Sequence, residues 1–175
     1  MIDPHTWADA RRVATRAFSS SLHFAVASLD ASGAPVLTPV GSVMLAEPGH
    51  VVFFELFAHG LGRRLDADPR VSLLGVDSGR WFWLRSLWQG RYARPPALRL
   101  WGTASACRSC TSAEEQRFLR RVGPLLRTRG GQRLWGRPGP VRDVWVEGID
   151  GVALAGMAPR LSAARRPRRW PGPPA

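Results

Sequence analysis

The chain has 175 residues, 45% of them hydrophobic, and a formal net charge of +12. This length fits one domain with a real apolar core, and no run of about 18 apolar residues is present that could span a bilayer. The first residues include early acids and no apolar signal-peptide region, which predicts a cytoplasmic protein. A basic surface can attract nucleic acid, anionic lipid or a phosphorylated small molecule, and charge alone does not choose among them.

The positive charge is unevenly spread along the chain. All 25 basic residues are arginine, and residues 158–175 alone carry +5. That C-terminal segment is rich in Arg and Pro and has little to bury, so we expect a disordered basic tail. Residues 1–157 are therefore predicted to form the folded domain.

The N-terminal half reads as a helix followed by strands. Asp3-Pro4 is a helix-start signal, and apolar residues at helical spacing extend the predicted helix to Ser19. Strands are predicted over 22–29, 34–45 and 50–56, with Gly33 in a turn at positive φ. The third run is almost wholly apolar, which predicts burial on both faces.

The C-terminal half adds three strands and one long helix. One or two helical turns are predicted over 61–67, and strands over 70–76, 97–106 and 141–149. Thr111 should cap a helix that has acids in its first turn, and 127–140 reads as a loop. Together the elements predict a mainly β domain with peripheral helices, built on a six-stranded antiparallel barrel.

Residues 78–96 combine five aromatic side chains with arginines, in the sequence SGRWFWLRSLWQGRYARPP. We favour an arm whose aromatic side chains are buried against a second subunit, with a lid over a ligand as the alternative. Stacking on nucleic-acid bases is the third alternative and the least favoured.

Few residues carry an obvious chemical motif. Cys107 and Cys110 lack the further ligands of a zinc site and are interpreted as incidental thiols, and no metal site is predicted. Gly60 and Gly62 free the backbone beside Arg63 and Arg64, where amides and guanidinium groups could hold a phosphate. Equally, both arginines could simply pair with Asp66 and Asp68 on a surface helix.

Four segments in order make the chain resemble the pyridoxamine 5′-phosphate oxidase-like family of FMN-binding split barrels. They are HFAVASLDASGAPVLTPVGSV, VVFFELF, LGRRLDADPRVSLLGVD and RLWGTA, spread over 23–104. The resemblance extends to an uncharacterised branch with an RWFWLRSL-type insertion. It implies a six-stranded Greek-key barrel, a homodimer, and flavin bound in the groove between the subunits.

The resemblance also implies which residues would contact the cofactor. The flavin ring would lie against the second and third strands, with Trp101 or the 81–88 arm covering it, and the phosphate would lie at the turn entering the short helix. The implied ring-side residues are Thr38, Pro39, Val40, Gly41, Ser42, Phe54, Glu55, Phe57 and Trp101. The implied phosphate-side residues are His59, Arg63 and Arg64.

This sequence departs from the oxidase pattern at the phosphate end. His59-Gly60-Leu61 replaces Ser-Arg-Lys, and Glu55 replaces Thr. A carboxylate repels a phosphate unless an arginine pairs with it. Oxidation of pyridoxamine phosphate itself is therefore not expected.

The sequence thus predicts an FMN-dependent oxidoreductase acting on an unidentified small substrate. No spacing of residues in the sequence identifies the catalytic residues. One alternative is a non-catalytic module that binds haem, deazaflavin or flavin on the same barrel. The other, which is less favoured, is a basic nucleic-acid-binding protein.

Overall fold

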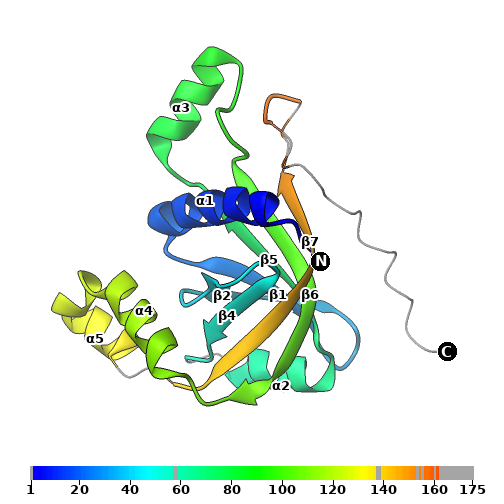
Figure 1. Ribbon diagram of the computed structural model, residues 1–175, viewed down its shortest axis with the longest axis vertical. Helices are drawn as coiled ribbons and strands as arrows, with labels where there is room; N and C mark the ends of the chain where they lie inside the picture. Colours follow the sequence, from blue (N-terminus) through cyan, green and yellow to red (C-terminus); the bar gives the residue numbers. More distant parts are fainter. Residues whose placement is uncertain are drawn as a thin grey trace.

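The structure, a computed structural model, describes residues 2–56, 59–136, 139–152, 154, 156–159 and 161. It is a mixed α/β fold in which a seven-stranded antiparallel sheet has the order β2-β1-β5-β6-β7-β4-β3 (Figure 1). The strands are β1 Phe24–Leu29, β2 Pro35–Val40, β3 Met44–Leu45, β4 His50–Phe54, β5 Arg70–Val76, β6 Ala97–Arg108 and β7 Val141–Val152. The helices are α1 Pro4–Ser21, α2 His59–Ala67, α3 Arg80–Gln89, α4 Ser112–Val122 and α5 Arg129–Trp135, with a 3-10 turn at Leu125–Arg127.

The sheet curls into a half-barrel because its two edge strands are consecutive in the chain. β2 and β3 lie at opposite edges, yet only residues 41–43 join them. At this junction Ser42 Oγ accepts a hydrogen bond from the Phe54 amide at 3.0 Å and donates one to the Phe54 carbonyl at 2.9 Å. The strand predicted over 34–45 is thus two strands, and the prediction of six strands is wrong by one.

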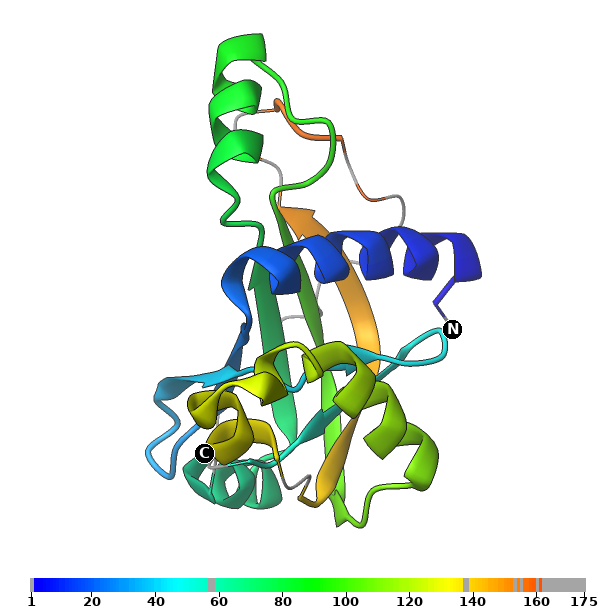
Figure 2. The same ribbon diagram turned by 90° about the vertical axis from the view of Figure 1, so that its left-hand side faces the viewer.

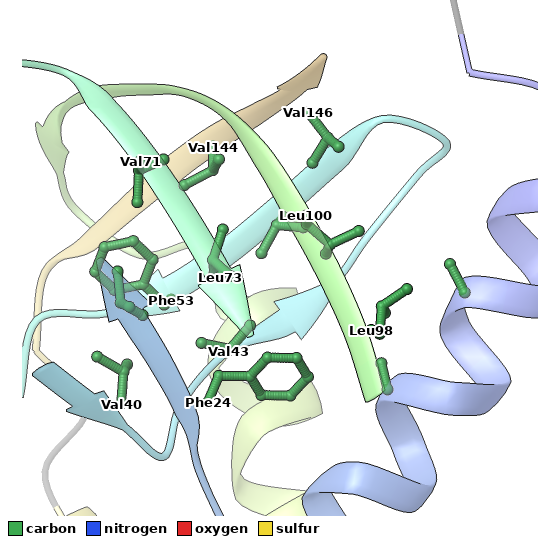
Figure 3. Close-up of a cluster of buried hydrophobic side chains, with 14 of the residues drawn as sticks. Phe24, Val40, Val43, Phe53, Val71, Leu73, Leu98, Leu100, Val144 and Val146 are labelled. Atoms are coloured by element: carbon green, nitrogen blue, oxygen red, sulfur yellow. The ribbon is translucent and has the colours of Figure 1, made fainter. Parts of the chain in front are cut away.

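The main core fills the inside of the curled sheet (Figure 3). Alternation along each strand places one set of apolar side chains inward, and the antiparallel register aligns Leu73 with Leu100. Complete burial of one such side chain contributes about 1.5–3 kcal/mol. The inward set from the strands is Phe24, Val26, Val40, Val51, Phe53, Val71, Leu73, Leu98, Leu100, Ala104, Val144, Val146 and Ile149.

Helix α1 covers this core, as its sequence pattern predicts. Asp3 accepts a hydrogen bond from the Thr6 amide at 2.9 Å and so caps the first turn, where Pro4 needs no amide partner. The buried stripe includes Trp7 and Phe18, and it packs against β1, β5 and β6 (Figure 2).

A second, smaller core lies between the outer face of β4 and helices α4 and α5. Phe54 and Phe118 are both fully buried, with ring centroids 4.6 Å apart. Since Val51 and Phe53 face the main core, β4 is buried on both faces, which confirms that prediction.

Two segments have more helix than the sequence pattern predicts. Residues 127–140, predicted as a loop, contain α5, which Thr128 caps through the Gly131 amide at 3.0 Å. Trp135 at its end packs against the second core, and this long-range contact stabilises a short helix that contains two glycines. The aromatic segment 78–96 contains α3, which projects beyond the sheet in both views (Figures 1 and 2). With five helices, the fold is mixed α/β instead of mainly β.

Two further observations concern the C-terminal segment and the search for a membrane-spanning helix. Ala158 and Leu161 are buried, so packing continues beyond residue 157. Most of 158–175 lies outside the described residues, and the disordered tail stays a prediction. Among the described residues, no helix has the length and apolar character needed to cross a membrane.

Candidate functional site

The strand register divides the predicted cofactor residues between the two faces of the sheet. Paired residues of antiparallel strands share a face. Thr38 pairs with Val26 and therefore points inward, whereas Pro39 pairs with Ala25 and points outward. One outward row crosses four strands and ends near the predicted ring-covering tryptophan: Leu37, Ala27, Ser72 and Trp101.

The outer face of β2, β1, β5 and β6 is the more open of the two. The Leu37 side chain is 69% exposed, and Pro39 and Arg99 are also exposed. The Trp101 indole packs against Gly148, where any Cβ would collide with it, and only 8% of Trp101 is exposed. This face therefore offers exposed apolar side chains on β2, whereas Trp101 on β6 is almost completely covered.

Helix α2 places Arg64 against β1 and β2, at one edge of the sheet. Its Nε donates to Ser28 Oγ at 2.8 Å and its Nη2 donates to Thr38 Oγ1 at 2.9 Å. Its Nη1 faces Gly60, whose missing Cβ would lie only 3.2 Å away. Arg63 on the same helix is exposed. Helix α2 therefore carries two adjacent arginines, and the guanidinium group of Arg64, in the last turn, is fixed by two hydrogen bonds.

The acids beside these arginines are paired elsewhere. Asp66 Oδ1 lies 2.9 Å from Arg142 Nη1, and Asp68 forms an ion pair with Arg70. Pairing of Arg63 or Arg64 with Asp66 or Asp68, the alternative left open by the sequence, is not found in the described part of the chain. Both cations remain available to an anion.

Arg142 is the residue of this region that sequence reasoning missed. Its side chain is 1% exposed, forms an ion pair with Glu55, and donates to the Ser105 carbonyl at 2.7 Å. Burial alone would lower the pKa of Arg142, but the bonds to Glu55 and Asp66 outweigh burial and raise it. The alternation of apolar residues along β7 could have indicated this burial. Arg142 stands two residues before the inward-facing Val144, so the charged residue occupies an inward position of the strand.

Glu55 fits against α2 only because the helix has a glycine there. A Cβ on Gly62 would lie 2.6 Å from Glu55 Oε2. The negative charge expected to repel a phosphate is therefore present at the first turns of α2, and Arg142 neutralises it. Arg142 also pairs in register with Cys107. Partial desolvation and the nearby Glu55 carboxylate raise the pKa of the Cys107 thiol, although the residue as a whole is exposed.

The remaining predicted residues have structural positions or lie outside the described set. Val40 is in the main core, and Ser42 and Phe54 close the junction between the sheet edges. Gly41 is the first residue of this junction. Phe57 and the side chain of His59 are outside the described residues.

Comparison with known proteins agrees with this geometry. A family model described as pyridoxamine 5′-phosphate oxidase matches residues 13–133, which is well over half of the chain. The chain belongs to the pyridoxamine 5′-phosphate oxidase-like family. The resemblance inferred from the sequence is thus confirmed. No curated protein matches the chain.

Solved structures share this family's fold at low sequence identity. An FMN-binding protein from Syntrophomonas wolfei matches with a TM-score of 0.58 and 10% identity, over 87% of this chain and 89% of that one. HupZ from Group A Streptococcus matches with a TM-score of 0.54 and 17% identity, over 85% and 92%. A heme binding protein from Mycobacterium smegmatis matches with a TM-score of 0.54 and 20% identity, over 89% of this chain and 57% of that one. The fold therefore occurs in a protein described as binding FMN and in one described as binding haem.

Proposed function

We propose that this chain is a homodimeric flavoprotein that binds FMN and acts as an oxidoreductase on a small-molecule substrate. The observation that carries the proposal is the arginine pair at α2. Arg64 is fixed by Ser28 and Thr38 with Nη1 facing the space left by Gly60, and Arg63 stands exposed beside it. Charge-assisted hydrogen bonds from such groups are the usual means of holding a phosphate.

Two further features support the FMN proposal. Arg142 neutralises Glu55, so the carboxylate does not cancel the charge of the arginine pair. β2 is an edge strand that carries Thr38 inward, toward the arginines, and Leu37 and Pro39 outward, toward the open face. The bound flavin would supply the electron-transfer chemistry, and the chain would orient it and exclude water.

A second copy of the chain is part of this proposal. The outer sheet face with Leu37 is open, and α3 exposes 82% of Trp81 and 91% of Trp88. Large apolar side chains exposed in this way on α3 are typical of protein interfaces. A partner subunit would cover the outer face and complete the groove.

The first experiment is to purify the full chain and identify any released small molecule by absorbance and mass spectrometry. The proposal expects a flavin spectrum, or quenching of FMN fluorescence on titration. Arg63→Ala should weaken FMN about ten-fold and leave riboflavin unchanged, because only FMN carries the phosphate. Arg120→Ala on α4 is the matched control, since Arg120 is an exposed arginine outside the site.

If Arg63→Ala lowers the affinity for FMN and for riboflavin equally, Arg63 does not bind the phosphate. If FMN neither copurifies nor binds, the flavin assignment fails. If a deazaflavin copurifies, as identified by its mass, the proposed groove still binds a cofactor, but that cofactor is a deazaflavin instead of FMN.

Haem is the second candidate, and one observation favours it. A heme binding protein from Mycobacterium smegmatis shares this fold over 89% of the chain, so the same sheet can carry a haem site. A copurifying chromophore with a Soret band would support a haem-binding module on the same sheet. A flavin spectrum without a Soret band would exclude it.

A further inference from the structure

A second concave site lies away from α2, between α1, β3 and α4. It is a cleft of about 440 Å³, within the size range of small-molecule sites. Its lining comes from α1, β1, residues 43–45 and α4, and α2 contributes no residue. The cleft is therefore separate from the proposed phosphate site.

The floor of this cleft is apolar and tightly packed. Phe18, Phe24, Val43 and Met44 line it, and each is less than a tenth exposed. These side chains belong to the two cores, so the floor is a rigid wall. An apolar ligand body would find preformed contact surface there.

Three arginines and no carboxylate line the same cleft. Arg121 lies with its guanidinium carbon 3.4 Å from the centroid of the Phe18 ring and donates a hydrogen bond to the Val43 carbonyl. Arg11 donates to the Ala46 carbonyl from the opposite helix. Arg117 stands exposed one turn before Arg121 on α4.

Two carboxylates on the helices that carry these arginines are held by other groups. Glu114 on α4 pairs with Arg108 at 2.7 Å, and Asp9 on α1 pairs with Arg12. Within the described chain no ion pair reaches Arg11, Arg117 or Arg121. Burial lowers the pKa of Arg121 to about 10, because its charge is desolvated without a counter-ion. At neutral pH the guanidinium is still protonated, so an anion in the cleft would relieve this cost.

We propose that the cleft between α1, β3 and α4 binds an amphipathic organic carboxylate. Its carboxylate would sit among Arg11, Arg117 and Arg121, and its apolar body would lie on Phe24 and Met44. Two of the guanidinium groups are already oriented by main-chain carbonyls, which lowers the ordering cost of binding. Planar guanidinium groups suit a carboxylate, which they can hold through two parallel hydrogen bonds.

The test uses the full chain and a displacement assay with the anionic fluorophore anilinonaphthalenesulfonate. Decanoate and decanol are compared as competitors, because they share the apolar body and differ in charge. Decanoate should bind at least about ten-fold tighter than decanol. Arg121→Gln and Arg117→Gln should each weaken decanoate several-fold and leave decanol unchanged.

Arg120→Gln is the control, because Arg120 shares α4 and is exposed but does not line the cleft. If Arg121→Gln fails to fold, Arg117→Gln decides, since the Arg117 side chain is exposed and is not needed for packing. Equal affinity for decanoate and decanol would overturn the proposal. So would an equal loss in Arg120→Gln, which would indicate a general charge effect. FMN binding is scored on the same variants and should not change, which separates this site from the proposed cofactor site.

Discussion

Arg142 is the residue on which the α2 end of the barrel most depends. It is almost completely buried and joins Glu55 on the segment after β4 to Asp66 on α2 and to the Ser105 carbonyl. A buried ion pair adds little compared with an apolar replacement of both partners. Removal of one partner, however, leaves an uncompensated charge.

We therefore expect Arg142→Met to lower the free energy of unfolding by about 3–5 kcal/mol, measured by urea denaturation at neutral pH. The reason is that Glu55, with a side chain only 13% exposed, would lose its counter-ion. Adding Glu55→Leu should restore part of the loss, because the unpaired charge is then gone. Arg99→Met, an exposed arginine on β6, serves as control and should change the value by less than about 0.5 kcal/mol. A loss of that small size in Arg142→Met would contradict this account.

At the scale of elements, one carboxylate joins the start of α4 to the sheet, in addition to the apolar packing of Phe118. Glu114 completes the capping box with Thr111 and also binds Arg108, which in turn binds Asp143 on β7. Arg108 and the hydrogen bonds from Thr111 lower the pKa of Glu114 from 4.5 to about 2. The same carboxylate thus fixes the start of the helix and its contact with the sheet.

This lowered pKa gives the stability a defined dependence on pH. A carboxyl group with a lower pKa in the folded state stabilises the fold at pH values above its unfolded pKa. The contribution of Glu114 should therefore be complete above pH 4.5 and be lost as the pH falls toward 2. Urea unfolding of wild type and Glu114→Gln across this range tests it. The variant should be less stable at pH 6 and show a shallower decline on acidification. Glu115→Gln, the neighbouring acid, should keep the wild-type slope; if Glu114→Gln also keeps it, the assignment is wrong.

Local signals in the sequence predicted most elements correctly. The strand at 70–76, the Asp3 and Thr111 caps and the positive φ of Gly33 are all confirmed, because each depends on neighbouring residues. The break at 41–43 was missed because it depends on Phe54, which hydrogen-bonds Ser42 across the sheet edge. Helix α5 likewise depends on a distant core.

For the candidate site, the sequence predicted the arginines of α2 but not the residues that hydrogen-bond or pair with the charged groups there. The partners of Arg64 come from β1 and β2, and the partner of Glu55 comes from β7, 87 residues later. Which face Thr38 and Pro39 occupy also depends on register, and a shift of one residue would exchange them. Such pairings follow from the topology of the sheet, which short motifs do not encode.

At the scale of the whole molecule, charge and apolar surface act in opposite directions on association. Each copy carries +12, so two copies repel at low ionic strength. The exposed side chains of Trp81, Leu84 and Trp88 on α3 favour contact with an apolar partner. Nucleic acid, by contrast, would be attracted by the same charge that keeps two copies apart.

The salt dependence of association therefore separates the homodimer from the nucleic-acid alternative. Screening weakens repulsion between like charges beyond a Debye length of about 10 Å at 0.1 M salt, so homodimer affinity should rise several-fold between roughly 0.02 M and 0.3 M salt. Affinity for nucleic acid should fall steeply over the same range. Analytical ultracentrifugation of the full chain measures the first, and anisotropy of a labelled oligonucleotide measures the second.

Two variants locate the surfaces involved. Trp88→Ser should weaken the homodimer about ten-fold at every salt concentration, because a large apolar contact is lost while α3 keeps its exposed position. Leu134→Ser on α5, a side chain that is also exposed, should have no effect. A deletion of 162–175, begun after the buried Leu161, removes four arginines; it should strengthen the dimer at low salt and weaken any nucleic-acid binding. A chain that stays monomeric at all salt concentrations would contradict the homodimer, and with it the proposal that a partner subunit completes the groove.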